Sequence, residues 1–277
     1  MTGSNIAASR GIEAGVVARQ GRNVTKTAPS AATQTRVLAE DQALYFDAEY
    51  HSPRDLALKQ LILRGRFGDS PIAILDLGGG NGRFLDALLE AFPTAQGTLL
   101  DLSQALLARN VRQPRKRLVH GSIDDLRSLV GSQKFDVVTI NWVLHHLVGD
   151  SYAQSQRNVV LCLETCASLL TPNGVIVVAE NLFEGFGGTN APSRIIYAIT
   201  SNRWRLFARV ARRFFNTAGV GVCFENEDTW GRLFDRAGLR IHRHSRGAAW
   251  KVRWKHRLLI GLLGLRSIRY GHFFLTR

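Results

Sequence analysis

The sequence has few cysteines, one methionine and no long apolar run, and these absences exclude several classes of protein. Three cysteines in 277 residues, at positions 162, 166 and 223, are too few and too scattered for a disulfide framework and indicate a reducing compartment. The longest apolar run, residues 258–265, contains two glycines and is far shorter than the roughly 20 residues of a transmembrane helix. No stretch has the hydrophobic region of a secretory signal. With 45% hydrophobic and 21% charged residues, the chain is globular by composition, and we expect a cytoplasmic protein.

Metal-ligand patterns are also missing. Cys162 and Cys166 lie four residues apart in a segment with helical character, a spacing that can place two thiols on one helix face. No Cys-x-x-Cys or His-rich pattern accompanies them, so they are interpreted as small apolar residues on a buried helix face. The sequence therefore predicts no metal.

Acidic residues are scarce in the last third of the chain. The net charge is +14, and residues 191–277 carry all of the excess, with 18 Lys and Arg against four acidic residues. Such an asymmetry indicates an anionic partner for this third, which could be nucleic acid, an acidic membrane surface or a charged substrate.

Residues 1–38 are rich in Ala, Ser, Thr, Gly and Gln and show no apolar periodicity, so we expect a flexible N-terminal tail. Their Arg-bearing, acid-poor composition mildly resembles an organelle transit peptide, but a plain N-terminal extension is the favoured interpretation.

Short apolar runs alternate with helix-like segments through the middle of the chain. An amphipathic helix is expected from Ser52 to about Arg66, and helices are expected over about 151–170 and 225–238. The apolar runs are Ile72–Leu77, Gly97–Leu100, Leu118–His120, Phe135–Ile140 and Gly174–Ala179, and a closing strand is expected over Tyr270–Thr276. This alternation predicts an α/β fold with a doubly wound, mostly parallel sheet. Ligands of such sheets bind beyond the carboxyl ends of the strands, where the polar residues described next are found.

The first run ends in Asp-x-Gly-x-Gly-x-Gly, formed by Asp76, Gly78, Gly80 and Gly82, directly before a helix. A dinucleotide turn would need a third glycine where Arg83 stands, and a phosphate-binding P-loop would need Gly-Lys-Ser/Thr, which is absent. Glycines here permit positive φ and close approach of a ligand to the backbone.

With this motif, residues 40–277 resemble the class I S-adenosylmethionine-dependent methyltransferases. The resemblance implies a Rossmann-like seven-stranded sheet in a single domain, residues 39–277, with a helical lid or insertion formed by about 40–66 and 185–222. It implies S-adenosylmethionine as cofactor, with Asp76, Gly78, Gly80, Asn81 and Gly82 against its ribose and amino acid. An acid at the end of the first strand can accept from the cofactor ammonium, directly or through water.

The ends of the next strands supply further expected cofactor contacts. Asp101, which ends the second run and is followed by Leu102, is placed to accept hydrogen bonds from ribose hydroxyls. After the third run the family usually has an acid directly after the glycine, but this chain has Ser122; Ile123 could pack on adenine while Ser122 or Asp124 receives its amino group. Asn141 ends the fourth run, the segment that faces the transferable methyl group in this family.

The adjacent His145 and His146 follow the fourth run, and either could take a proton from an attacking hydroxyl near neutral pH. Both could instead be structural, because methyl transfer from a sulfonium depends mainly on positioning. Methyltransferases of nucleic-acid amines usually have an Asn/Asp-Pro-Pro-aromatic turn at this point, whereas Val143 to Leu147 here resemble the small-molecule branch of the family.

Expected substrate contacts are Tyr45 and Tyr50 in the N-terminal lid piece and Glu180 and Asn181 after the fifth run. Arginines and aromatic residues alternate through residues 195–215, so we expect this insertion to cover an apolar substrate. Residues 250–263 place two tryptophans among cations before an apolar patch, which suits a membrane interface or an acidic amphiphilic ligand, and also RNA.

Three functions are consistent with these features. The first is methyl transfer to a small, hydrophobic or lipid-like metabolite or natural product, with oxygen favoured over nitrogen or carbon as the accepting atom and a possible peripheral membrane contact. The second is RNA methylation, and the third is a non-catalytic scaffold with a methyltransferase fold. The sequence predicts no oligomeric state.

Overall fold

The computed structural model describes residues 35–36, 42, 52–202, 217–250 and 261–277. Three segments discussed above lie wholly or mostly outside these ranges: the predicted tail, the aromatic and basic residues 203–216, and the segment 250–263. Thr35 and Arg36, which fall within the expected tail, are described and contact the domain. No helix in the described ranges is long and apolar enough to cross a membrane.

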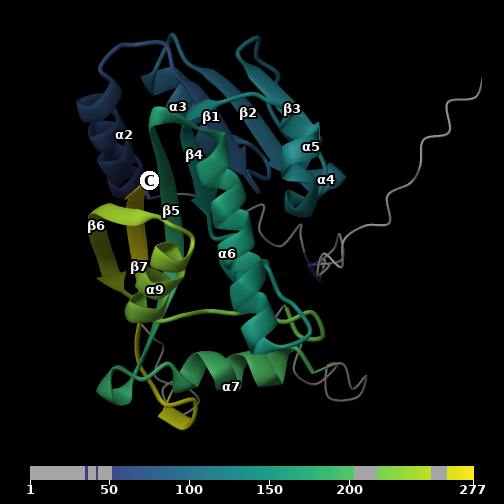
Figure 1. Cartoon of the computed structure of the whole chain (residues 1–277), viewed down its shortest axis with the longest axis vertical. Coiled ribbons are helices and arrows are strands. Elements are labelled where there is room, and N and C mark those ends of the chain that lie inside the picture. Colours follow the sequence, from purple (N-terminus) through teal and green to yellow (C-terminus); the bar gives the residue numbers. More distant parts are fainter. Residues whose placement is uncertain (1–34, 37–41, 43–51, 203–216, 251–260) are drawn as a thin grey trace, which may run out of the picture. The chain divides into compact units, whose positions relative to one another are not determined.

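Seven strands form one sheet in the order β3-β2-β1-β4-β5-β7-β6 (Figure 1). All neighbouring strands from β3 to β5 run parallel, whereas β7 is antiparallel to both β5 and β6. The strand bounds are β1 Ala73–Leu77, β2 Gln96–Asp101, β3 Lys116–His120, β4 Phe135–Asn141, β5 Leu170–Gly185, β6 Arg240–Ala249 and β7 Leu265–Thr276. The doubly wound sheet predicted from the alternation and the seven strands implied by the resemblance are therefore confirmed.

Helices cover both faces of the sheet. On one face, α2 (Pro53–Phe67) and α3 (Arg83–Ala91) bury leucines such as Leu63 and Leu88 against β1 and β5. On the other face, α5 (Leu126–Val130), α6 (Tyr152–Leu169) and α9 (Glu227–Arg236) pack around Phe135 and Trp230. The remaining elements are short or lie at the sheet's edge: α4 Gln104–Leu107, η2 Ile123–Asp125, η3 Leu144–His146, η4 Phe186–Gly188 and α7 Ala191–Thr200.

The helix expected from Ser52 is present as α2, because the Ser52 hydroxyl accepts the Asp55 N–H and Pro53 occupies the first turn. This helix packs on the sheet, and among its residues only Leu56 lines the cavity described below. Between Phe135 and Val137 the pairing of β4 with β5 shifts by several residues, so residues 171–174 form an irregularity within β5.

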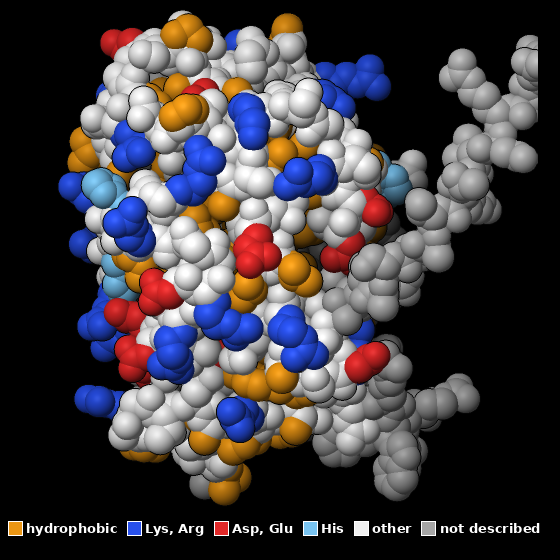
Figure 2. Space-filling view, in the orientation of Figure 1, with side chains coloured by type: hydrophobic (Ala, Val, Ile, Leu, Met, Phe, Trp, Pro, Cys, Tyr) orange, Lys and Arg blue, Asp and Glu red, His pale blue; other side chains and the backbone are white. Residues whose placement is uncertain are grey.

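Cationic side chains are spread over the visible face in Figure 2, with acidic side chains between them. In the described part of the last third, an exposed row formed by Arg240, His242 and Arg243 follows the outer strand β6. Glu227 binds Arg246 on the same strand, with carboxylate-to-guanidinium distances of 2.5 and 2.8 Å. The described surface therefore mixes both signs of charge.

Candidate functional site

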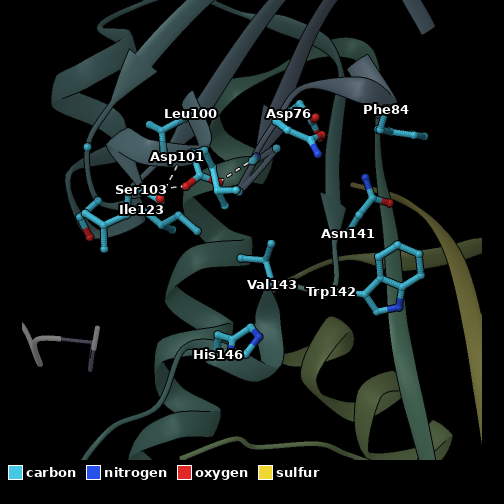
Figure 3. A pocket seen from close by; sticks show the side chains of 18 of the residues that line it. Asp76, Phe84, Leu100, Asp101, Ser103, Ile123, Asn141, Trp142, Val143 and His146 are labelled. Atoms are coloured by element: carbon cyan, nitrogen blue, oxygen red, sulfur yellow. Dashed lines mark hydrogen bonds between the residues drawn. The ribbon is translucent and has the colours of Figure 1, made fainter. Parts of the chain in front are cut away.

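A cavity of about 590 Å³ opens at the carboxyl edge of the parallel strands (Figure 3), within the size range of small-molecule sites. Its walls come from the turns and strand ends that follow β1, β2, β3 and β4. These places contribute Asp76, Gly78–Asn81, Asp101–Ser103, Gly121–Asp124 and Asn141–Val143. All residues predicted to contact the cofactor line the cavity except Gly82, which directly precedes α3.

The turn after β1 depends on glycine at alternate positions. Gly78, Gly80 and Gly82 have φ values of 64°, 53° and 77°, the left-handed region that glycine occupies without strain. Space is also restricted, since a Cβ on Gly78 would lie 2.5 Å from Val143 Cγ2. The Gly-x-Gly-x-Gly pattern is therefore a backbone requirement, and it leaves the turn open to a ligand.

Asp76, at the end of β1, has one carboxylate oxygen bound and one without a partner. Its Oδ1 accepts from the Thr139 hydroxyl at 2.6 Å, while its fully buried Oδ2 has no hydrogen-bond partner among the described residues. Burial raises the pKa of Asp76 to about 7. Because buried polar atoms are almost always paired, this oxygen fits a cationic donor such as the ammonium of the expected cofactor.

Asp101 connects the glycine turn to the end of β2. Its Oδ2 accepts from the Gly80 N–H and its Oδ1 from the Ser103 N–H, both at 2.8 Å (Figure 3). Each carboxylate oxygen has a second lone pair, so the group can also accept from a hydroxyl. Asp101 thus fits the ribose of the cofactor while fixing the turn that surrounds it.

The wall after β3 is closed by the N-terminal segment. Ser122 Oγ accepts from the Asp124 N–H and caps η2, and the Asp124 carboxylate accepts from both the N–H and the hydroxyl of Thr35. Ser122 and Ile123 line the cavity as expected. Asp124 lines it too, but both of its oxygens are engaged by Thr35.

Trp142 holds an unusual backbone conformation where β4 ends. Its φ of 55° is the only positive value for a non-glycine residue in the described ranges. Such a conformation costs about 1–3 kcal/mol and concentrates at ligand sites. The backbone N–H of Trp142 donates to Ala179 O at 2.8 Å, and the indole ring packs edge-on against Tyr270 with the ring centres 5.9 Å apart. These contacts hold the indole at the wall of the cavity.

Lys59, which the sequence analysis did not single out, lies buried beneath the same wall. Its Nζ donates to Asn141 Oδ1 at 2.8 Å and lies 4.8 Å from the centre of the Phe84 ring. Burial lowers the pKa of Lys59 to about 7, and the Asp76 and Asp55 carboxylates oppose that shift. A signal was available: Lys59 falls between Leu56 and Leu63 at helical spacing, within the apolar stripe of α2.

The two adjacent histidines occupy different environments. His146 lines the cavity, and burial holds the pKa of its ring well below the usual value, so the ring is neutral at pH 7. His145 lies outside the cavity lining, with its Nδ1 2.7 Å from Glu180 Oε2 and its ring stacked on Phe224. The structure thus separates the pair that the sequence analysis treated together.

Glu180 and Asn181, the substrate residues expected after the fifth run, also lie outside the cavity lining. Glu180 is fully buried, and its Oε1 accepts from the Leu144 N–H, so it fixes the connection after β4 instead of facing a ligand. Asn181 points its Oδ1 into the protein, where it has no partner among the described residues. Tyr45 and Tyr50 lie outside the described residues.

Arg36 is a second residue that the sequence analysis missed. Its guanidinium donates to Ser201 O and Val220 O, both at 3.2 Å, and its N–H donates to Val148 O. Arg36 also lines the cavity. It therefore ties the N-terminal segment to loops more than 100 residues away, a pairing that no local pattern reveals.

The central part of this chain is similar to a known protein family. Residues 75–176 match a family model described as a methyltransferase domain. The structure is similar to that of an S-adenosylmethionine-dependent methyltransferase from Geobacter sulfurreducens bound to S-adenosylhomocysteine. That likeness has 16% identity, a TM-score of 0.53, and coverage of 88% of this chain and 99% of the other. At this identity it shows the fold.

Two curated relatives differ in their acceptors. The chain is 32% identical over 97 residues to a 23S rRNA (guanine(748)-N(1))-methyltransferase of Streptomyces fradiae, covering 35% of each chain. It is 33% identical over 102 residues to the O-methyltransferase gliM of Aspergillus fumigatus, covering 33% of this chain and 22% of the relative. The matches thus span about a third or less of these relatives.

Proposed function

We propose that the class I S-adenosylmethionine-dependent methyltransferase domain of this chain transfers a methyl group to the oxygen of a small, hydrophobic or lipid-like metabolite. The observation that carries the proposal is the unpartnered Oδ2 of Asp76, buried in a cavity whose glycine turn leaves room for a ligand. A carboxylate oxygen in that position needs a cationic donor, which the amino-acid end of the cofactor provides.

The residues around the cavity would contact different parts of the cofactor. Gly78, Gly80 and Asn81 would lie against the cofactor, Asp76 would accept from its ammonium, and Asp101 would accept from its ribose. The bound cofactor supplies an electrophilic methyl group on a sulfonium. Positioning of the acceptor in line with that methyl group provides most of the rate enhancement in such a reaction.

The acceptor side of the cavity is formed by Trp142, Val143, His146 and Leu147. The apolar members of this wall exclude water and favour a hydrophobic acceptor. The neutral ring of His146 can accept a hydrogen bond from an acceptor hydroxyl, but its lowered pKa makes it a weak base. It would therefore orient the acceptor, and an acceptor that ionises unaided, such as a phenol or an acid, suits the site best. The O-methyltransferase relative supports oxygen as the accepting atom.

Calorimetric titration with S-adenosylhomocysteine tests the proposal before any acceptor is known. The wild type should bind, and Asp101→Ala should lose about 100-fold in affinity, since it removes an ionised acceptor and releases the glycine turn. Asp235→Ala, an exposed acid on α9, is the matched control. A folded wild type that binds neither S-adenosylmethionine nor S-adenosylhomocysteine would favour the scaffold. If binding is found, product analysis with phenols, hydroxy acids and fatty acids identifies the acceptor.

RNA methylation is the second candidate, favoured by the rRNA-methylating relative and by the basic last third. RNA-binding affinity should then fall steeply with salt, because each neutralised phosphate releases counterions. Weak, sequence-blind binding at physiological salt would leave the small-molecule function alone.

A peripheral membrane contact through residues 250–263 remains part of the proposal for a lipid-like acceptor. Its test is sedimentation of the whole chain with anionic vesicles at low salt, with neutral vesicles as the control. An absence of cosedimentation removes this part and leaves the methyl transfer untouched.

A further inference from the structure

The buried ammonium of Lys59 lies where three residues of the cavity wall converge. Asp76, Phe84 and Asn141 all line the cavity and are drawn in the same part of it in Figure 3. Lys59 itself does not line the cavity but contacts this group from behind, through Asn141 Oδ1 at 2.8 Å and the face of Phe84 at 4.8 Å. A cation buried in this way is costly unless nearby groups compensate it, so its placement calls for an explanation.

The hydrogen bond to Asn141 determines which way that amide points. An ammonium only donates, so the amide oxygen must face Lys59, and the amide nitrogen lies on the side of Asp76 (Figure 3). Asn141 then offers donors on the same side of the cavity where Asp76 offers an acceptor. A zwitterionic amino acid, with one carboxylate and one ammonium, matches this pair.

Charge links Lys59 to Asp76 as well. Burial raises the pKa of Asp76 to about 7, and the positive charge of Lys59 works against that rise. Asp101 raises the pKa of Asp76 further and Lys116 lowers it. On the other side, Lys59 faces Asp55 of its own helix and His272 of β7, whose pKa is lowered to about 4 mainly by burial, so this imidazole stays neutral from pH 5.5 upward.

We propose that Lys59 is a positioning residue for the amino-acid end of the cofactor, which holds the amide of Asn141 by its oxygen and places a positive charge behind the wall that contains Asp76. This inference rests on the proposed function. Lys59 touches neither the cofactor nor the acceptor and acts through Asp76 and Asn141.

The sign of the pH dependence follows from the ionisation of Asp76. Its carboxylate accepts from the cofactor ammonium only when ionised, so affinity should rise as the pH increases toward 7. Lys59 loses its proton around the same pH, so the bend in the affinity profile belongs to the Asp76–Lys59 pair. Removal of the Lys59 charge raises the pKa of Asp76 in the free protein. The bend in the affinity profile should therefore move to higher pH by about one unit, with a loss of about tenfold in affinity at pH 7.

The test is calorimetric titration of S-adenosylhomocysteine from pH 5.5 to 9 into the wild type and three variants of the full chain. Lys59→Met removes the charge and the donor, Lys59→Gln replaces the ammonium by a shorter, neutral side chain that can still donate, and Lys59→Arg keeps a charge. The bend should shift in the Met and Gln variants and stay in the Arg variant. Lys134→Met, which removes an exposed lysine remote from the cavity, is the control. Thermal unfolding checks that each variant folds, and the Gln variant carries the test if the Met variant does not fold.

A second ligand separates positioning from a general structural effect. 5′-Methylthioadenosine shares the adenosine and the sulfur but lacks the amino-acid end, so its affinity should be flat with pH and unchanged in all Lys59 variants. Equal losses for both ligands, or an unmoved bend in folded Lys59→Gln, would overturn the inference while leaving the proposed function intact. An absence of S-adenosylhomocysteine binding by the wild type would overturn both.

Discussion

The two halves of the cavity are constructed in different ways. On the β1–β2 side, the wall is mostly backbone: glycines at positive φ, and Asp101 holding the N–H groups of Gly80 and Ser103. Beyond Asn141, on the β4 side, the wall is made of side chains such as Trp142, Val143 and His146, and Arg36 joins it from the distant N-terminal segment. The first half is arranged for one ligand shape, whereas the second can change its ligand by changing single side chains. This contrast suits a fixed cofactor and a variable acceptor.

The largest expected effect comes from a substitution in the glycine turn after β1, on the backbone side of the cavity. A Cβ on Gly79 would lie 2.5 Å from Asp76 Oδ2 and 2.7 Å from Leu99 Cγ, although this glycine does not have a positive φ. Gly79→Ala should therefore displace the Asp76 carboxylate and weaken S-adenosylhomocysteine binding by about 100-fold, since a charged hydrogen bond contributes about 1.5–3 kcal/mol. Isothermal titration measures the loss.

Its matched control is Gly80→Ala in the same turn. There the added Cβ meets nothing closer than 3.6 Å, and the cost is the left-handed φ of 53° alone. That strain is about 1–2 kcal/mol, so binding should weaken by less than about tenfold. A ranking in which Gly80→Ala is the more damaging would contradict the close approach described at Gly79.

The next effect concerns folding and should leave the cofactor side intact. Glu180→Gln removes the charge that accepts from the Leu144 N–H and from His145. We expect a loss of about 1–3 kcal/mol in the free energy of unfolding, with S-adenosylhomocysteine affinity within about threefold of the wild type. Urea denaturation measures the first and titration the second, with Glu164→Gln on the exposed face of α6 as the control. A large loss of affinity at unchanged stability would return Glu180 to the ligand site.

A third effect tests whether Trp142 is strained. Both Trp142→Ala and Trp142→Gly remove the indole, but only glycine occupies a φ of 55° without cost. The Gly variant should therefore unfold with a free energy about 1 kcal/mol higher than the Ala variant, a reversal of the usual order of these residues. Equal or lower stability of the Gly variant in urea denaturation would show that the backbone relaxes once the ring is gone.

The smallest effect concerns the adenine end. Ser122 and Asp124 both line the cavity and are the two candidate partners of the adenine amino group, because the oxygens of each keep a lone pair beside the hydrogen bonds they already accept. Ser122→Ala should lower the affinity for 5′-methylthioadenosine by about threefold to tenfold, which is the contribution of one neutral hydrogen bond. The inosine analogue, which lacks the amino group, should bind both proteins alike, and parallel losses for the two ligands would assign Ser122 to capping η2 alone.

The same contrast explains how much the sequence could predict. The alternation of strands and helices and the cofactor wall follow from local patterns, because a glycine spacing or an apolar run is visible in a few consecutive residues. Lys59, Arg36 and the separation of His145 from His146 depend on pairings across 82 to 184 residues and on burial, which no short pattern contains. Glu180 illustrates the limit: it follows the fifth apolar run, which indicated a strand end, but β5 continues to Gly185, so Glu180 lies within the strand and its carboxylate accepts from the Leu144 N–H.

The position of β7 affects how the chain can assemble during synthesis. The strand synthesised last among the seven lies between β5 and β6, antiparallel to both. On the ribosome, β6 therefore emerges with no strand to pair with, and β5 keeps an open edge until residues 265–276 leave the exit tunnel. A nascent chain that stalls before that point leaves the β7-facing edges of β5 and β6 unpaired, and such edges promote aggregation and chaperone binding.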